Sequence, residues 1–105
     1  HTAWYTVGTY KELKTAKVVQ KNGGVLGIGR TQSISGSFDK NVFTEVDTKN
    51  TMVISLNSSR AKLITRHPMQ SYSMEKTGDG QLTLHIKDPE LFWSISKYLV
   101  VETKA

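Results

Sequence analysis

The chain has 105 residues, which is room for one domain, and its 37% hydrophobic and 22% charged residues are typical of a folded protein rather than a disordered tail. It contains no cysteine, which excludes disulfides, thiolate nucleophiles and sulfur-ligated metals. The net charge of +5 comes from cations scattered between Lys11 and Lys104, and this scatter argues against a nucleic-acid-binding surface.

The hydrophobic runs are short. The longest, residues 98–101, has the length of a strand, whereas a helix needs ~20 apolar residues to cross a bilayer. The chain also begins with His1 rather than with methionine. We expect that either a leader was removed or a domain was excised from a longer protein, and any targeting information would have gone with the missing part. We also expect residues 1–105 to be a single globular domain.

The N-terminal part predicts a strand followed by a short helix. Residues 3–7 are rich in aromatic and β-branched side chains, which favours a strand. Thr9 and Glu12 have the spacing of a capping box, so a helix should run from Tyr10 to about Ala16 and bury Tyr10 and Leu13. Residues 20–41 are the least regular part of the chain.

Residues 24–31, with the sequence GVLGIGRT, nearly fit the phosphate-binding loop G-x-x-x-x-G-K-[ST]. Arg30 occupies the lysine position, and a guanidinium is a poor substitute for the flexible ammonium that reaches the phosphates. Neither flank has the pattern of the buried strand and the helix that such a loop must join. We therefore interpret this segment as a glycine-rich hairpin or flap.

Strand signals resume at Val42 and continue to the end of the chain. Met52, Ile54 and Leu56 alternate with their neighbours, which predicts a strand with one apolar face. Further strands are predicted at residues 61–66, 72–74 and 82–87. The glycines of residues 77–80 should supply positive φ angles and make a hairpin between the last two of these strands.

The last segments add one helix and one strand. Asp88 followed by Pro89 is a helix start, and the helix should continue to about Ile95 and bury Leu91, Phe92 and Ile95. Residues 98–101 are apolar throughout, which predicts a strand covered on both faces. The whole pattern predicts a mainly β (α+β) fold, an antiparallel barrel or sandwich of about seven strands with two short helices.

Residues that could support catalysis or metal binding are sparse. His1, His67 and His85 do not have the spacing of a zinc site, so we expect neither a metal nor another cofactor. The serines form neither a G-x-S-x-G elbow nor an S-x-x-K pair in a helix. We therefore expect a protein that is not an enzyme. A hydrolase that brings distant carboxylates together stays open as an alternative.

Three cations form the candidate ligand-binding site. Arg60, Lys62 and Arg66 share strand parity, so they should project from one face over about 20 Å. Such a stripe could meet a sulfated polysaccharide or an acidic protein surface. A simpler interpretation is a solvated edge strand whose charges discourage edge-to-edge aggregation.

The order of short motifs along the chain also indicates kinship. The motifs are TAWY (residues 2–5), GT (8–9), KELK (11–14), FT (43–44), VD (46–47), AKLIT (61–65), HP (67–68), SY (71–72), DP (88–89), FWS (92–94) and SKYLV (96–100). With these, the chain resembles the C-terminal domain of Bacteroidota surface lipoproteins, some of which are named collagen-binding glycoprotein adhesins. In that family a lipid-anchored N-terminus leads into a long coiled coil, and a domain of this size closes the chain.

The resemblance implies location and partners. It implies an exported lipoprotein of the cell surface or outer membrane, facing the periplasm or the outside. Membrane contact would come only through a lipid anchor upstream, and self-association only through the coiled coil. The family supplies no catalytic residues to carry over.

The leading functional hypothesis is a non-enzymatic surface module that binds a host matrix protein such as collagen, or an acidic glycan, and no nucleic acid. A structural cap of the coiled coil without a ligand, and a glycan or peptidoglycan hydrolase, are the alternatives.

Overall fold

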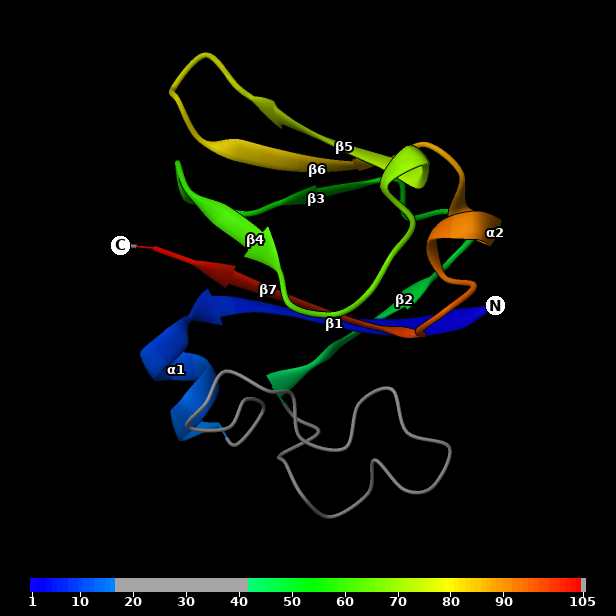
Figure 1. The fold of residues 1–105 in the computed structure, drawn as a ribbon, viewed down its shortest axis with the longest axis horizontal. Coiled ribbons are helices and arrows are strands. Elements are labelled where there is room, and N and C mark those ends of the chain that lie inside the picture. The colour runs from blue at the N-terminus through cyan, green and yellow to red at the C-terminus, as the bar shows by residue number, and fades with distance from the viewer. Residues whose placement is uncertain (17–41, 105) are drawn as a thin grey trace.

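A computed structural model describes residues 1–16 and 42–104. The glycine-rich segment 24–31 lies outside these residues. The described part is mainly β, as predicted, with seven strands in two sheets and two short helices (Figure 1). In chain order the elements are β1 (Thr2–Thr9), α1 (Tyr10–Thr15), β2 (Thr44–Asp47), β3 (Val53–Ser55), β4 (Ala61–Leu63), the 3-10 turn η2 (Met69–Ser71), β5 (Tyr72–Lys76), β6 (Leu82–Ile86), α2 (Pro89–Phe92) and β7 (Tyr98–Thr103).

The strands form a sandwich of two sheets. The first has the order β2-β1-β7-β4 and the second the order β3-β6-β5, and they are not closed into a barrel. Four of the five strand pairs are antiparallel, but β1 and β7 run parallel, with Trp4 opposite Tyr98 and Thr9 opposite Thr103. The sandwich is thus antiparallel as predicted except for this one parallel pair at the centre of the first sheet.

A bend between β3 and β4 joins the two sheets at one edge. Before the bend, the Leu56 N–H donates to the Leu82 carbonyl of the second sheet, at 3.1 Å. After it, the Lys104 N–H donates to the Arg60 carbonyl in the first sheet, also at 3.1 Å. Asn57 has a φ of 52°, in the left-handed region that asparagine adopts more readily than most residues. We call residues 57–60 the corner, because here one continuous chain changes sheets.

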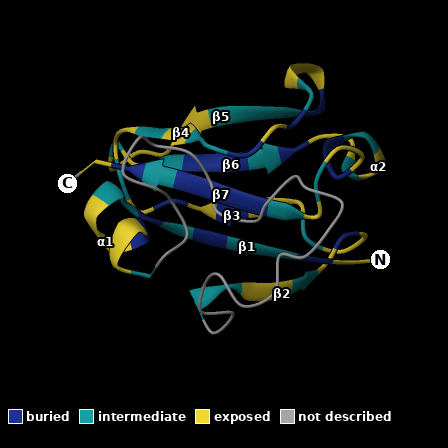
Figure 2. Ribbon diagram, turned by 60° about the horizontal axis from the view of Figure 1, so that its bottom comes forward, coloured by how far each residue is buried: buried dark blue, intermediate teal, exposed yellow. Residues whose placement is uncertain are grey.

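The main core fills the space between the inner faces of the two sheets, where buried residues follow the strand interiors (Figure 2). Phe92 and Trp93 from the α2 end of the sandwich belong to this core. Its other buried members are Ala3, Ile54, Leu56, Leu84, Ile86, Leu99 and Val101. The alternation of inward residues along β1, β4 and β7 is the period-2 pattern expected of strands that cover a core on one face.

A second, smaller cluster lies on the outer face of the first sheet, where Leu13 of α1 packs against Val100 of β7. Together with the main core it covers both faces of β7, whose residues Leu99, Val100 and Val101 are fully buried, as predicted. The capping box that begins α1 is also confirmed.

Two predicted elements are shorter than expected. α2 ends at Phe92 and not at Ile95, because Ser94 binds the Leu91 carbonyl through its N–H and closes the last turn tightly. Ile95 is consequently 57% exposed rather than buried. β4 ends at Leu63, because the chain bends at Thr65 and the Thr65 hydroxyl accepts the Val100 N–H at 3.1 Å in place of a backbone carbonyl.

The hairpin between β5 and β6 is confirmed. Its loop closes with a 2.8 Å bond from the Thr77 N–H to the Gln81 carbonyl. Gly80 has a φ of 83°, whereas Gly78 does not adopt a positive φ, so only one of the two glycines fills the predicted role. None of the helices in the described ranges is long and apolar enough to cross a membrane.

Candidate functional site

Two of the three predicted cations lie together at the edge of the first sheet. Arg60 directly precedes β4, and Lys62 is its central residue. With Lys104 and Glu102 from the end of β7 and Ala61 from β4, they line a shallow depression of about 280 Å³. We call Arg60, Lys62 and Lys104 the basic edge.

The antiparallel pairing of β4 with β7 explains why these cations gather. The register places Lys62 opposite Glu102, and the next pair on the same side joins Arg60 to Lys104. Residues two apart in a strand point to the same face, so the four side chains belong to one surface. Among the described residues, the one ion pair within 4.0 Å lies elsewhere, between His85 and Glu75. The side chains of the basic edge are all exposed. Glu102 is the one acid among the described residues that line the depression.

Arg66 lies apart from this group. Its predicted place in the stripe assumed that the strand continued to residue 66, but β4 ends at Leu63 and the chain bends at Thr65. Arg66 is exposed and does not line the depression.

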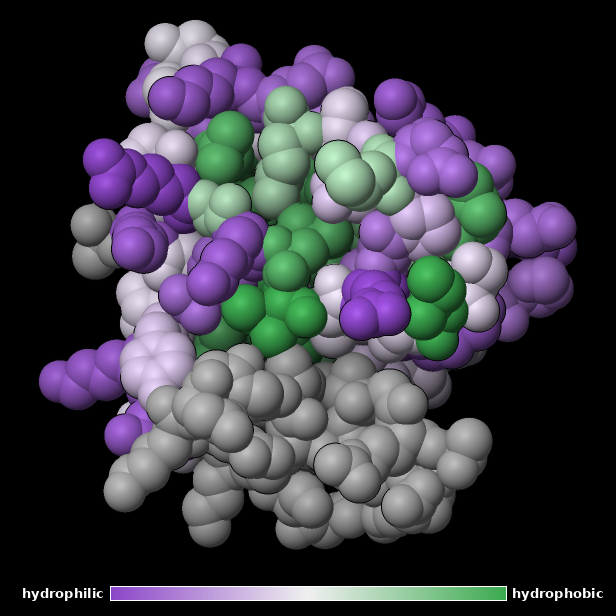
Figure 3. All heavy atoms as spheres, in the orientation of Figure 1, coloured by the Kyte–Doolittle hydropathy of each residue, from purple (hydrophilic) through white to green (hydrophobic). Residues whose placement is uncertain are grey.

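The surface around β4 is mixed in character. In the view of Figure 3, hydrophobic residues gather at the centre of the face between β4 and α2, and hydrophilic residues surround them. The large apolar side chains with the highest exposure elsewhere on the described surface are Met69 of η2, Ile95 after α2 and Val53 of β3.

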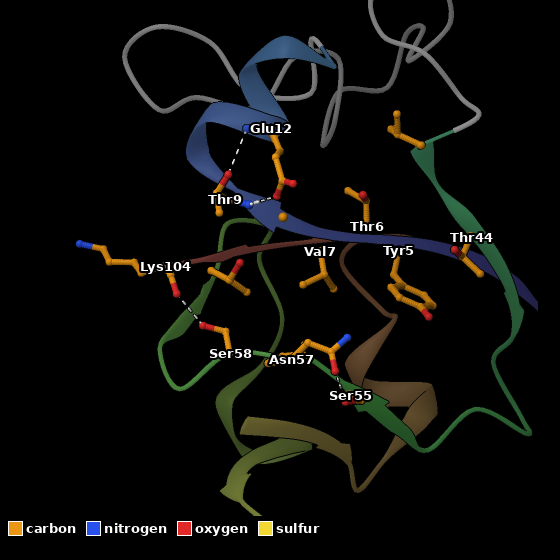
Figure 4. Close-up of a pocket in the computed structure, with 14 residues that line it drawn as sticks. Tyr5, Thr6, Val7, Thr9, Glu12, Thr44, Ser55, Asn57, Ser58 and Lys104 are labelled. Carbon is orange, nitrogen blue, oxygen red and sulfur yellow. Dashed lines mark hydrogen bonds between the residues drawn. The ribbon is translucent and has the colours of Figure 1, made fainter. Parts of the chain in front are cut away.

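A second concave region includes Asn57 and Ser58 of the corner in its lining. It is a groove of about 470 Å³ between β1 and the segment that leads from β3 into the corner (Figure 4). Its lining residues are Tyr5, Thr6, Val7, Gly8, Thr9, Glu12, Val42, Thr44, Ser55, Leu56, Asn57, Ser58, Thr103 and Lys104. Residues 57–59 are all polar, which is typical of a turn. Nothing in this sequence pattern indicates that the turn lies opposite β1.

His67 is a buried residue whose two ring nitrogens both make hydrogen bonds. Its Nδ1 lies 2.8 Å from the Phe92 carbonyl oxygen, and its Nε2 lies 2.8 Å from the Thr65 hydroxyl. Burial lowers the pKa of His67 below 6.5, against the smaller effect of its backbone hydrogen bonds. The ring therefore serves the packing between the segment after β4 and α2.

Glu45 and Asp47 both lie on β2 and line a depression of about 280 Å³, and Asp88 and Glu90 lie at the start of α2, whereas the other acidic residues of the described part are spread over separate elements. Asp47 at the end of β2 accepts the Lys49 N–H and the Asn50 amide, both at 2.9 Å. Asp88 caps α2 by accepting the Leu91 N–H at 3.2 Å. Within residues 1–16 and 42–104, no three histidine or acidic side chains come close enough together to hold a metal ion.

Comparison of the chain with family models, with curated proteins and with solved structures found no match. The functional argument therefore starts from the two concave regions that flank the corner, one basic and one lined by neutral polar groups.

Proposed function

We propose that this chain is the non-enzymatic C-terminal binding module of an exported coiled-coil surface lipoprotein, and that it binds an acidic partner through the basic edge. The observation that carries this proposal is the gathering of Arg60, Lys62 and Lys104 around one depression, where Glu102 is the only acid among the described residues of the lining. Cations that converge on one surface favour partners of opposite charge and accelerate encounter with them.

The partner that fits this surface is a sulfated glycan or an acidic stretch of a matrix protein such as collagen. The depression is shallow and its charges are exposed, so each contact is screened by solvent and salt. Affinity per domain should therefore be weak. Several copies held together by a coiled coil would bind a repetitive matrix far more tightly, because each later contact is intramolecular.

The distribution of the acids supports a binding role over hydrolysis. A glycosidase requires two carboxylates that flank one bond, about 5–9.5 Å apart. Asp47 and Asp88, in contrast, each bind backbone or amide groups of their own turn or helix. Among the described residues, the depression of the basic edge and the groove each have one acid in their linings, and the depression that holds two acids, Glu45 and Asp47, is the one where the Asp47 carboxylate is already bound.

The test measures binding of the domain to immobilised type I collagen and to immobilised heparin, by surface plasmon resonance, between about 50 and 300 mM NaCl. We expect binding to at least one surface, with an affinity that falls steadily as salt rises. Absence of binding at the lowest salt, or binding that salt does not change, would contradict the proposal. If binding is absent and an added upstream coiled coil raises the melting temperature strongly, the structural cap is the better description.

A further inference from the structure

We infer that the groove between β1 and the corner is a second binding site, which takes a neutral, hydroxyl-rich ligand: a saccharide. In Figure 4 the side chains of Tyr5 and Val7 extend from β1 toward the opposite wall, which carries Ser55 and Asn57. The volume of about 470 Å³ lies within the range of small-ligand sites, about 300–1,000 Å³.

The register of the first sheet explains why the groove is open. β2 pairs with β1 only from Thr2 to Tyr5, whereas β7 pairs with it from Trp4 to Thr9. The second half of β1 therefore extends past the end of β2. The chain from Ser55 at the end of β3 to Ser58 in the corner passes beneath this part of β1, and the space between them forms the groove (Figure 4).

Polar groups from β1, β2 and the corner line this space. The Tyr5 hydroxyl, the Thr44 hydroxyl and the Asn57 side-chain nitrogen make no hydrogen bond with any residue in the ranges 1–16 and 42–104. The Asn57 amide is nevertheless oriented, because its oxygen accepts the Ser55 hydroxyl at 3.2 Å. Two hydroxyls and an amide nitrogen supply both donors and acceptors, which suits the alternating hydrogen bonds of sugar hydroxyls.

The charges of the groove argue against an ionic ligand. Its lining contains one acid, Glu12, and one cation, Lys104. The Glu12 carboxylate already accepts the Thr9 N–H at 2.8 Å as part of the capping box. The formal charges in the lining cancel, so neither a polyanion nor a metal ion finds complementary charge there.

A peptide strand added to β1 is a less suitable occupant. Strand addition needs a row of unused backbone donors and acceptors. Tyr5 already pairs with Thr44 of β2, and the Thr9 N–H is bound to Glu12. The part of β1 between Tyr5 and Thr9 is too short to form a row of backbone hydrogen bonds with an added strand. The side-chain hydroxyls and the amide of the groove suit a sugar better.

This site is independent of the basic edge. Among the described residues that line them, the two regions share only Lys104. Binding in the groove should therefore depend little on salt, and it should survive removal of the Arg60 and Lys62 charges.

The test titrates the ¹⁵N-labelled domain with cellotriose, chitotriose and mannotriose at millimolar concentration and follows the amide resonances. We expect at least one of these sugars to shift resonances around Tyr5, Thr44 and Asn57. Asn57→Asp, which replaces the donor and tolerates the left-handed backbone, should weaken that binding about three- to tenfold, and Tyr5→Phe should do the same. The control is Gln81→Glu, the same amide-to-acid change in the β5–β6 loop, which should leave binding unchanged.

Absence of shifts with all three sugars would overturn the inference, as would shifts confined to another surface. Equal weakening by Asn57→Asp and Gln81→Glu would also overturn it, because a general charge effect would then explain the loss. If an extended peptide shifts the groove resonances and the sugars do not, the strand-addition alternative is correct. None of these outcomes depends on whether the basic edge binds collagen or heparin, so the groove and the proposed function are tested separately.

Discussion

The imidazole ring of His67 lies face to face with the ring of Phe92, with centroids 4.1 Å apart and planes within 10° of parallel. The His67 Nδ1 is also 2.8 Å from the Phe92 carbonyl oxygen. A carbonyl oxygen can only accept, so Nδ1 carries the hydrogen and Nε2 accepts from the Thr65 hydroxyl. Because the same hydroxyl accepts the Val100 N–H, a chain of hydrogen bonds ties a neutral imidazole to α2 and β7.

This arrangement predicts that acid destabilises the fold through His67. Burial lowers the pKa of His67 below its ordinary 6.5, so near pH 6 the native protein binds fewer protons than the unfolded chain does. The stability that His67 contributes is complete above pH 6.5 and is lost as the pH falls through the folded-state pKa. Urea unfolding between about pH 5 and pH 7.5 should show the free energy of unfolding decreasing over this range.

Two asparagine variants separate His67 from other titrating groups. His67→Asn lowers stability at every pH, but it should flatten the pH dependence near neutrality. The matched control is His85→Asn, which removes a histidine whose side chain is 37% exposed rather than buried. An unchanged slope in His67→Asn would show that other groups cause the acid sensitivity.

Thr65→Val should be more destabilising than its size suggests. The change keeps the shape of the side chain but removes the donor to His67 and the acceptor of the Val100 N–H, both buried. Leaving these groups unsatisfied should lower the free energy of unfolding by about 2–4 kcal/mol. Thr65→Ser keeps the hydroxyl and should cost about 1 kcal/mol for the lost methyl group. Equal losses in the two variants, measured by urea unfolding, would contradict the hydrogen-bond argument.

The features that the sequence predicted well depend on near neighbours in the chain. The Thr9 capping box, the start of α2 at Asp88 and the hairpin that contains Gly80 each form within a few residues. The backbone geometry of such motifs is set locally, so residue identity and spacing suffice to find them. The burial of Phe92 was predicted correctly for the same reason, because the first residue of its helix was identified correctly.

The features that were missed depend on contacts between distant segments. The parallel pairing of β1 with β7 joins the two ends of the chain, and strand patterns carry no information on direction. Thr65 ended β4 early by binding Val100, which separated Arg66 from Arg60 and Lys62. The groove likewise arises where the corner passes beneath β1. No local signal could have shown any of these arrangements.

Gly80 should be intolerant of a side chain. Its φ of 83° is accessible to glycine and strained for other residues, although no atom lies within 4 Å of the position that a Cβ would take. Gly80→Ala should therefore cost about 1–2 kcal/mol through backbone strain alone. Gly78→Ala is the matched control, because that position is equally open and has no positive φ. Thermal unfolding should show a lower melting temperature for the first variant only, and similar values for both would mean that the loop readjusts.

The basic edge should lose affinity when its charges are removed together. Arg60→Ala with Lys62→Ala deletes two of the three cations around the depression and should weaken collagen or heparin binding about three- to tenfold. The matched control, Lys76→Ala with Lys87→Ala, removes the same net charge from exposed positions at the ends of β5 and β6.

A general charge effect would lower affinity equally in both double variants, whereas a local site predicts a loss in the first alone. Arg66→Ala adds a third comparison, because the bend at Thr65 places Arg66 outside the depression and its loss should have a smaller effect than that of Lys62. Plasmon resonance at low salt measures all three. Unchanged binding in the Arg60 and Lys62 double variant would remove the basic edge from the mechanism, because Lys104 would then be its one remaining cation and no convergence of charge would be left.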